Sequence, residues 1–322
     1  MKPLPATEEN IRRAAGIIKD GGIVAFPTET VYGLGADAFN PEAVARIFEA
    51  KQRPFFDPLI VHIGDIRQLD MVAASIPDMG RECARRFWPG PFTMVLPKSA
   101  NVPDIVTAGL DTVGIRMPAH DIARRLIAEA GTPVAAPSAN PFGYISPTSA
   151  SHVARQLGDR VDMILDGGPC AVGVESTIVR LDGSGCIVLR HGGLPVEDIE
   201  DVTGTLYEKE EKGDPQAPGQ LPYHYSPSTP VILVDSIEDI PRFLPTHGIL
   251  AFTRPEIDTR QAPVEVLSRD GSLREAAVRL FDCLHRLDGM GLGCIYAQKV
   301  PEEGLGRAIM DRLRKAAARG SS

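Results

Sequence analysis

The chain has 322 residues, of which 43% are hydrophobic and 24% are charged, and its net charge is −8. This length favours two domains, since one domain usually takes about 100–200 residues. No apolar run approaches the roughly 18 residues that a membrane-spanning helix needs, and the first residues lack the apolar core of a secretory signal. We therefore expect a two-domain globular protein of the cytoplasm.

The charge is unevenly distributed. Residues 1–195 contain 19 Lys and Arg against 21 Asp and Glu, a balance of −2, and residues 196–322 contain 15 against 21, a balance of −6. This acidic total disfavours a broad basic face for nucleic acid but allows a local cationic cleft. The cysteines form no C-x-x-C pair, so we expect buried, reduced thiols rather than a zinc site. They are Cys83, Cys170, Cys186, Cys283 and Cys294.

The first two thirds of the chain alternate short apolar segments with segments of helical periodicity. In residues 8–20, Ile11, Ala14, Ala15 and Ile18 recur on one helical face. Strands are predicted at 21–27, 58–63, 91–97, 112–118, 132–137, 161–165, 175–181 and 186–190. Helices are predicted at 8–20, 41–50, 77–87, 121–130 and 149–157. This order predicts an α/β domain over residues 1–195 with a mostly parallel or mixed sheet.

Residues 196–228 have a different composition, because they are acidic in their first part and carry several Pro and Gly residues. We interpret them as a linker. Residues 229–322 predict a second, smaller α/β domain. Its strands are predicted at 231–235, 248–252, 264–268 and 293–298, and its helices at 272–288 and 304–318.

Common nucleotide and hydrolase motifs are missing. The sequence has no G-x-x-x-x-G-K-[ST], no H-E-x-x-H and no G-x-S-x-G. The glycines of "GMGLG" (289–293) follow a predicted helix and precede a strand, so we interpret them as turn residues rather than a dinucleotide-binding loop. If this protein binds phosphate, it does so with side chains.

Polar residues gather where the predicted strands end, which is where open α/β sheets bind ligands. Taken singly, residues such as Ser138 and Asn140 are also typical of turns. The cations that adjoin strand ends are Lys51, Arg53, Arg116 and Arg190. Like charges gathered near a core are unfavourable unless an anion is present. The pattern therefore predicts a polyphosphate together with a carboxylate.

Seven motifs together resemble the YrdC-like domain of L-threonylcarbamoyladenylate synthases over roughly residues 8–195. They are "FPTETVYGLG", "KQRP" followed by "PLIVH", "WPGPFT", "GIRMP", "PSAN", "GVESTIV" and "LRHGG". The "HYSP" at 224–227 and the module after it resemble the long form of that family. The resemblance implies a YrdC-like twisted mixed sheet with flanking helices, a linker at 196–228 that reaches over the active site, and a Rossmann-like C-terminal α/β domain.

The resemblance also implies an activity. Such enzymes condense L-threonine, bicarbonate and ATP to threonylcarbamoyl-AMP and pyrophosphate. Mg²⁺ enters with the ATP phosphates, without a metal held directly by the protein and without an organic cofactor. Downstream tRNA threonylcarbamoyl-transfer proteins then modify the adenosine beside the anticodon, and tRNA itself is a further candidate partner. No membrane partner is implied.

The motif positions imply site residues. Lys51 and Arg53 are implied as catalytic, near the phosphates. The implied ATP-binding residues are Arg53, Asp57, Thr112, Ser138, Asn140, Ser146, Arg190 and Tyr225. The implied threonine-binding residues are Thr30, His62, Arg116, Ala136 (through its backbone) and Ser176.

Two of these positions leave alternatives open. Many family members have Asn where Asp57 stands, and a carboxylate there would repel phosphate unless it acts through Mg²⁺ or pairs with Arg53. His62 interrupts an apolar strand, so it either lines a cavity or is a hydrogen-bonded core histidine. For the linker, we expect Tyr225 to close over the nucleotide.

Two other functions share features with this sequence. The first is an RNA-binding YrdC-like module without catalysis, which salt-sensitive tRNA binding without ATP turnover would favour. The second is a carbamoyl-transfer enzyme of the hydrogenase-maturation kind, which shares the domain. Enzymes of that kind carry zinc-type cysteine clusters, and this sequence shows none.

Overall fold

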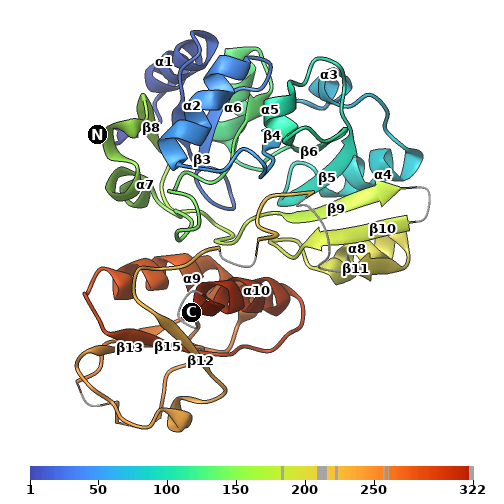
Figure 1. Cartoon of the computed structure of the whole chain (residues 1–322). Helices are drawn as coiled ribbons and strands as arrows, with labels where there is room; N and C mark the ends of the chain where they lie inside the picture. Colours follow the sequence, from blue (N-terminus) through green and yellow to red (C-terminus); the bar gives the residue numbers. More distant parts are fainter. Residues whose placement is uncertain (183–184, 209–215, 222–223, 257, 260, 319–322) are drawn as a thin grey trace.

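The computed structural model describes all residues except 183–184, 209–215, 222–223, 257, 260 and 319–322 (Figure 1). It contains two sheets, one of eleven strands and one of four. Both are accompanied by helices, which confirms the predicted α/β class. Over the described ranges, no helix is both long and apolar enough to cross a membrane.

The large sheet is mixed, as predicted, and has the order β1-β8-β2-β3-β7-β4-β6-β5-β9-β10-β11. Its strands are β1 (Leu4–Pro5), β2 (Val24–Phe26), β3 (Gly33–Asp37), β4 (Ile60–His62), β5 (Phe92–Pro97), β6 (Thr112–Arg116), β7 (Val134–Ala135), β8 (Met163–Asp166), β9 (Thr177–Asp182), β10 (Gly185–Arg190) and β11 (Leu206–Glu208). The neighbours β4 and β6 run parallel, whereas β9 and β10 run antiparallel.

Helix α2 (Pro41–Lys51) of this domain begins at a side-chain cap. Asn40 accepts hydrogen bonds from the second and third residues of its helix, and Pro41 occupies the first turn. The helices are α1 (Glu8–Lys19), α2 (Pro41–Lys51), α3 (Leu69–Val72), α4 (Asp78–Phe87), α5 (Asp104–Thr107), α6 (Asp121–Ala130), α7 (Ala150–Gln156) and α8 (Val196–Thr203), with 3-10 turns at Ile66–Gln68 and Gly158–Arg160.

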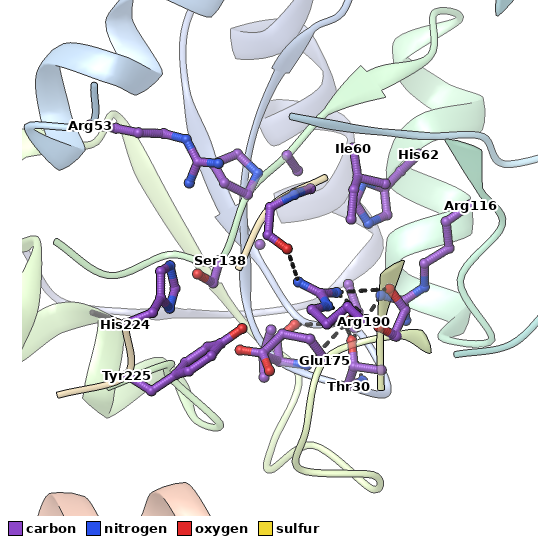
Figure 2. A pocket seen from close by; sticks show the side chains of 17 residues that line it. Thr30, Arg53, Ile60, His62, Arg116, Ser138, Glu175, Arg190, His224 and Tyr225 are labelled. Atoms are coloured by element: carbon purple, nitrogen blue, oxygen red, sulfur yellow. Dashed lines mark hydrogen bonds between the residues drawn. The ribbon is translucent and has the colours of Figure 1, made fainter. Parts of the chain in front are cut away.

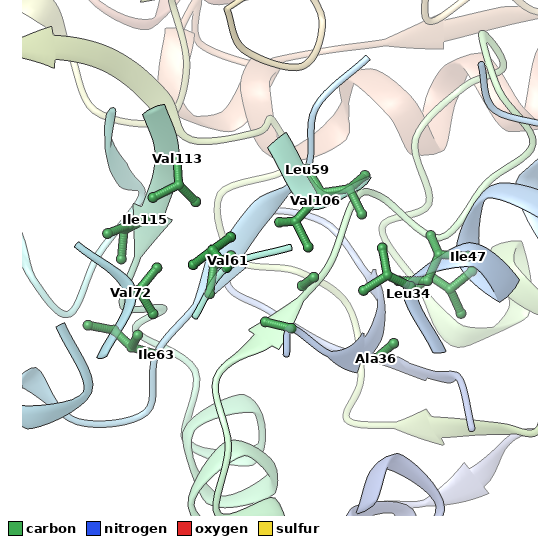
Figure 3. Packing of buried hydrophobic residues seen from close by; sticks show 14 of the residues in the cluster. Leu34, Ala36, Ile47, Leu59, Val61, Ile63, Val72, Val106, Val113 and Ile115 are labelled. Atoms are coloured by element: carbon green, nitrogen blue, oxygen red, sulfur yellow. The ribbon is translucent and has the colours of Figure 1, made fainter. Parts of the chain in front are cut away.

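Strand alternation separates the core from the opposite face of the sheet. Val61 of β4 and both Val113 and Ile115 of β6 pack in the main hydrophobic cluster (Figure 3). Side chains of successive strand residues point to opposite faces, so the residues between them, such as His62, point away from this cluster. The main cluster therefore covers one face of the sheet at β4 and β6, and smaller hydrophobic clusters share the opposite face with the residues that can form a site.

The C-terminal domain has a parallel sheet of order β12-β15-β13-β14. Its elements are β12 (Val231–Val234), β13 (His247–Ala251), β14 (Val264–Val266), α9 (Leu273–Asp288), β15 (Cys294–Gln298) and α10 (Leu305–Ala318), with a 3-10 turn at Ile237–Asp239. Figure 1 shows α9 and α10 on the side of this sheet that faces the large domain. Val31 and Val174 of the large domain belong to the same buried cluster as Leu280 of α9, so the domains share a core.

Two parts of the predicted organisation differ from the structure. Residues 196–208, assigned to the linker, form α8 and β11, and β11 pairs with β10 at the edge of the large sheet. The acidic composition hid this helix, in which Ile199 is buried while its acidic neighbours face solvent. The glycine-rich strand β3 was not predicted. The described part of the chain contains no disulfide, and Cys294 is the one cysteine there that is not fully buried.

Candidate active site

One pocket brings together most of the predicted site residues (Figure 2). It contains about 500 Å³ of space free of protein atoms, part of it open to solvent. Nine of the fourteen predicted residues line it, namely Thr30, Arg53, His62, Arg116, Ala136, Ser138, Ser176, Arg190 and Tyr225. Figure 2 shows Arg53 on one side of the pocket and Arg116 on the other, with Arg190 and Glu175 between them.

The strand pair β4 and β6 forms one wall of the pocket. Their parallel register places His62 beside Arg116. The His62 ring is buried, and its Nδ1 has no hydrogen-bond partner among the described residues. Burial, followed by the charge of Arg116, lowers the pKa of His62 to about 3. The ring is therefore neutral at pH 7 and presents a polar nitrogen in a cavity wall.

Arg116 is held in one orientation by three contacts. Its Nη1 donates to Thr30 Oγ1 at 2.9 Å and its Nε donates to the Gly90 carbonyl at 3.2 Å. Its Nη2 lies 2.6 Å from Glu29 Oε1 in a buried ion pair. A guanidinium fixed in this way can offer a planar pair of donors to a carboxylate.

Arg190 lies at the end of β10 and contacts neutral oxygens. It donates to the Ser176 carbonyl from Nη2 at 2.9 Å and from Nε at 3.2 Å, and to Ser176 Oγ at 3.2 Å. Its Nη1 donates to the Pro218 carbonyl at 3.1 Å. No carboxylate of the described chain forms an ion pair with Arg190, so the acids Glu175 and Asp311 act on its charge only from a greater distance.

Arg53 and Asp57 form a buried ion pair, with Nη2 and Oδ2 2.9 Å apart. Arg53 also donates to the Asp57 and Pro58 carbonyls at 3.1 and 2.8 Å. Burial raises the pKa of Asp57, and the charge of Arg53 opposes this shift. Asp57 does not line the pocket, so of the two alternatives for this carboxylate the geometry favours pairing with Arg53.

Lys51 also lies behind the pocket wall, which differs from its expected position near the phosphates. Its buried Nζ donates to the carbonyls of Ser138 and Asn140, at 2.5 Å each. Burial, followed by the charge of Arg53, lowers the pKa of Lys51 well below its ordinary value. In this structure Lys51 holds the turn that carries Ser138 in the pocket.

Three further predicted residues lie outside the main pocket. Asn140 donates from Nδ2 to the carbonyls of Pro141 and Tyr144, both at 2.9 Å. Ser146 donates from Oγ to Glu175 at 2.5 Å. Thr112 lines a smaller neighbouring pocket, which shares Ile60 and Pro218 with the main one.

These contacts correct the argument that four cations require an external anion. Arg53 and Arg116 each have a carboxylate of this chain beside them, and Lys51 is held by carbonyls. Carbonyls hold Arg190 as well, but among the four cations of the described chain it alone both lines the pocket and forms no ion pair. The anion-binding character of the pocket therefore depends chiefly on Arg190.

The linker forms the remaining wall through Pro218, His224 and Tyr225. Tyr225 has a φ of 61°, a left-handed conformation that is rare for a bulky residue and costs about 1–3 kcal/mol. Its ring is buried, yet its hydroxyl has no hydrogen-bond partner in the described residues. A strained tyrosine with an unused hydroxyl fits a ligand-contacting position better than a core position.

Glu175 and Arg312 are site features to which the sequence assigned no role. Glu175 lines the pocket, and Arg312 of α10 forms an ion pair with it at 3.0 Å. A signal was present, because Arg312 falls on the apolar face of its helix together with Ile309 and Ala316. An arginine at such a position needs a buried partner.

The lowered pKa of His62 predicts acid sensitivity. Because folding holds this histidine neutral, the unfolded chain binds the extra proton below pH 6.5, and the unfolding free energy falls as the pH falls from 6.5 toward 3. Between pH 7 and pH 5 we expect His62 to account for a loss of about 2 kcal/mol. Urea unfolding of the wild type and of His62→Gln at both pH values measures it. Equal losses in the two proteins would contradict the assignment, and His247→Gln is the control substitution.

Comparisons with known proteins match both domains of the chain. A family model described as telomere recombination matches residues 16–192, and one described as the C-terminal domain of threonylcarbamoyl-AMP synthase matches residues 194–318. The threonylcarbamoyl-AMP synthase of Pyrococcus abyssi is 46% identical over 96% of this chain and 94% of its own length. That of Bacillus subtilis is 42% identical, over 98% and 94%.

A solved structure is similar over both domains. The crystal structure of a Pyrococcus abyssi protein complexed with L-threonine has a TM-score of 0.91 and 44% identity, and the match covers 98% of this chain and 96% of that one. Two matching domain models, full-length relatives and a full-length structural match lead to one conclusion. The chain belongs to the threonylcarbamoyl-AMP synthase family of enzymes, in its two-domain form.

Proposed function

We propose that this protein condenses L-threonine, bicarbonate and ATP to threonylcarbamoyl-AMP and pyrophosphate. The observation that carries the proposal is that one pocket is lined both by a guanidinium prepared for a carboxylate, Arg116, and by a guanidinium without a counter-ion, Arg190. An amino acid and a nucleotide would occupy adjacent parts of such a pocket. The full-length relatives named threonylcarbamoyl-AMP synthase support the same reaction.

The proposed threonine side consists of Thr30, His62, Arg116, Ser176 and the backbone at Ala136. Arg116 would bind the threonine carboxylate, and neutral His62 would contact the ligand without adding charge. The proposed nucleotide side consists of Arg53, Ser138, Arg190 and Tyr225, with Thr112 in the adjoining pocket. Lys51, Asp57, Asn140 and Ser146 would support these residues from behind.

The proposed reaction has two steps. First, the threonine nitrogen and bicarbonate form a carbamate with loss of water. A carbamate oxygen then attacks the α-phosphorus, and the bond from that phosphorus to the pyrophosphate oxygen breaks. Negative charge grows on the non-bridging oxygens and on the leaving group, where a fixed guanidinium stabilises it. Mg²⁺ would arrive with the phosphates. Positioning three reactants in one pocket would supply much of the rate.

The purified protein should release pyrophosphate from ATP only when both threonine and bicarbonate are present. A coupled pyrophosphate assay, with mass spectrometry of the nucleotide product, measures this. Serine should be a poor substitute, because it lacks the methyl group of threonine. The loss of one buried methyl group should lower kcat/KM about 10-fold or more. Release without threonine, or equal use of serine, would contradict the proposal.

The product is a reactive mixed anhydride, so a transfer protein must consume it. We propose that tRNA threonylcarbamoyl-transfer proteins are those partners and that the reaction occurs in the cytoplasm. Addition of such a system and tRNA to the reaction should yield threonylcarbamoyl-adenosine.

A further inference from the structure

Arg312 is the largest side chain that is fully buried in the described chain, and it belongs to the C-terminal domain. Burying a guanidinium is costly unless its donors and charge are met. Its Nε donates to Glu175 at 3.0 Å, and its Nη1 donates to the His191 carbonyl and to Asp311, both at 2.7 Å. All three contacts lie at the boundary with the pocket wall or on α10 itself.

Both oxygens of the Glu175 carboxylate are engaged. Ser146 of the large domain donates to Oε1, and Arg312 of the C-terminal domain donates to Oε2. Glu175 nevertheless lines the pocket, close to Arg190 in Figure 2. An acidic group therefore stands in the wall of a pocket proposed to bind polyphosphate, and its main counter-charge lies behind that wall.

The same arginine supports the linker. The Arg312 guanidinium carbon lies 5.0 Å from the centre of the Tyr225 ring, a cation–π contact. Lys315, one helical turn further along α10, donates to the Gly219 carbonyl at 2.6 Å. The last helix thus holds the linker segment that carries Tyr225 into the pocket.

Glu175 and Arg312 act on Arg190 in opposite directions. Burial is the main influence and lowers the pKa of Arg190. Among the neighbouring groups Tyr225 raises this pKa most, Arg312 lowers it, and Glu175 and Asp311 raise it. Without Arg312, the negative charge of Glu175 would no longer be paired and would interact mainly with Arg190. The positive charge on which the anion-binding character depends would then be partly offset by Glu175.

We propose that Arg312 is a positioning residue by which the second domain completes the nucleotide pocket. It neutralises Glu175 and orients Tyr225, so that the positive charge of Arg190 stays available to the phosphates of ATP. This inference rests on the proposed function for the identity of the anion. It assigns the C-terminal domain an electrostatic part in the reaction.

Three variants test the proposal, because the two single substitutions are expected to change ATP affinity in opposite directions. Arg312→Met should weaken ATP binding about tenfold or more, since it leaves an unpaired carboxylate in the phosphate pocket. Glu175→Gln should preserve or tighten ATP binding, because it removes an acidic charge from the pocket wall and leaves Arg312 with Asp311 as its remaining carboxylate partner. The double variant should return to within about threefold of the wild type, because both charges are gone. Calorimetry with MgATP in the absence of threonine measures these affinities.

A merely structural ion pair would give a different pattern, in which all three variants bind ATP more weakly and unfold at lower temperature. That pattern would overturn the proposal. If Arg312→Met does not fold, the ATP affinities of Glu175→Gln and of the double variant still test the proposal. The double variant removes both charges of the Glu175–Arg312 pair, so neither is left without its partner. Arg314→Met is the matched control, since Arg314 lies on the same helix but is half exposed and pairs with Glu302.

The experiment separates this inference from the proposed function. Pyrophosphate release by the wild-type protein tests the reaction, whereas the calorimetric series tests only how Arg312 and Glu175 affect the nucleotide. In the release assay, Arg312→Met should raise the KM for ATP more than it lowers kcat. A fall in kcat at unchanged KM would contradict a role in nucleotide binding.

Discussion

Replacing Arg116 by lysine is expected to lower kcat/KM for threonine about 100-fold, with at most a severalfold change in the KM for ATP. The guanidinium donates to Thr30 and to the Gly90 carbonyl while its remaining edge meets Glu29. An ammonium keeps the charge but cannot hold these partners and a carboxylate in one plane. Loss of the planar guanidinium should therefore appear as a lower kcat/KM for threonine.

Initial rates of pyrophosphate release, with each substrate varied in turn, measure this effect. Arg125→Lys is the control, because Arg125 is about half exposed and pairs with Glu8 at the surface. A larger effect on ATP than on threonine would place the amino-acid carboxylate elsewhere in the pocket. Calorimetry with threonine alone gives the same comparison without turnover.

The wall that contains Arg116 could be predicted from sequence because strand alternation is local. Leu59, Val61 and Ile63 alternate with Ile60 and His62, so a buried apolar set on one face requires the intervening residues to face the other way. The histidine within an apolar strand is explained by this alternation. The pairing of His62 with Arg116 across two strands could not be predicted, since register is a tertiary property.

The internal counter-ions were beyond sequence analysis for the same reason. Glu29 and Arg116 are far apart in the chain, and only the assembled sheet brings their charges to 2.6 Å. The pair of Arg53 and Asp57, four residues apart, was an alternative that the spacing itself suggested. Lys51 shows where prediction from sequence stops. A cation beside a strand end has the same sequence pattern whether its side chain faces a ligand or two carbonyls.

The contribution of the second domain does not follow from charge composition, which describes segments. A helix is predicted at 304–318, but the partner of the arginine on its buried face lies in the other domain, and only the tertiary structure brings the two together. The acidic start of the supposed linker likewise concealed α8 and β11. Composition describes solvent-facing residues well, whereas single buried residues such as Ile199 and Arg312 decide the packing.

Replacing Arg190 by methionine is expected to have the largest effect, a loss of about 10³-fold in kcat/KM for ATP. The substitution removes the one pocket guanidinium that, in the described chain, forms no ion pair with a carboxylate, and it leaves the Ser176 carbonyl without two of its donors. Arg190→Lys should recover about tenfold of this loss, because it restores the charge but not the fork. Rates at varied MgATP measure both variants, with the exposed Arg67→Met as control. If methionine and lysine were equally harmful while ATP affinity stayed at the wild-type value, the charge of Arg190 would serve the backbone of Ser176 and Pro218 rather than the nucleotide.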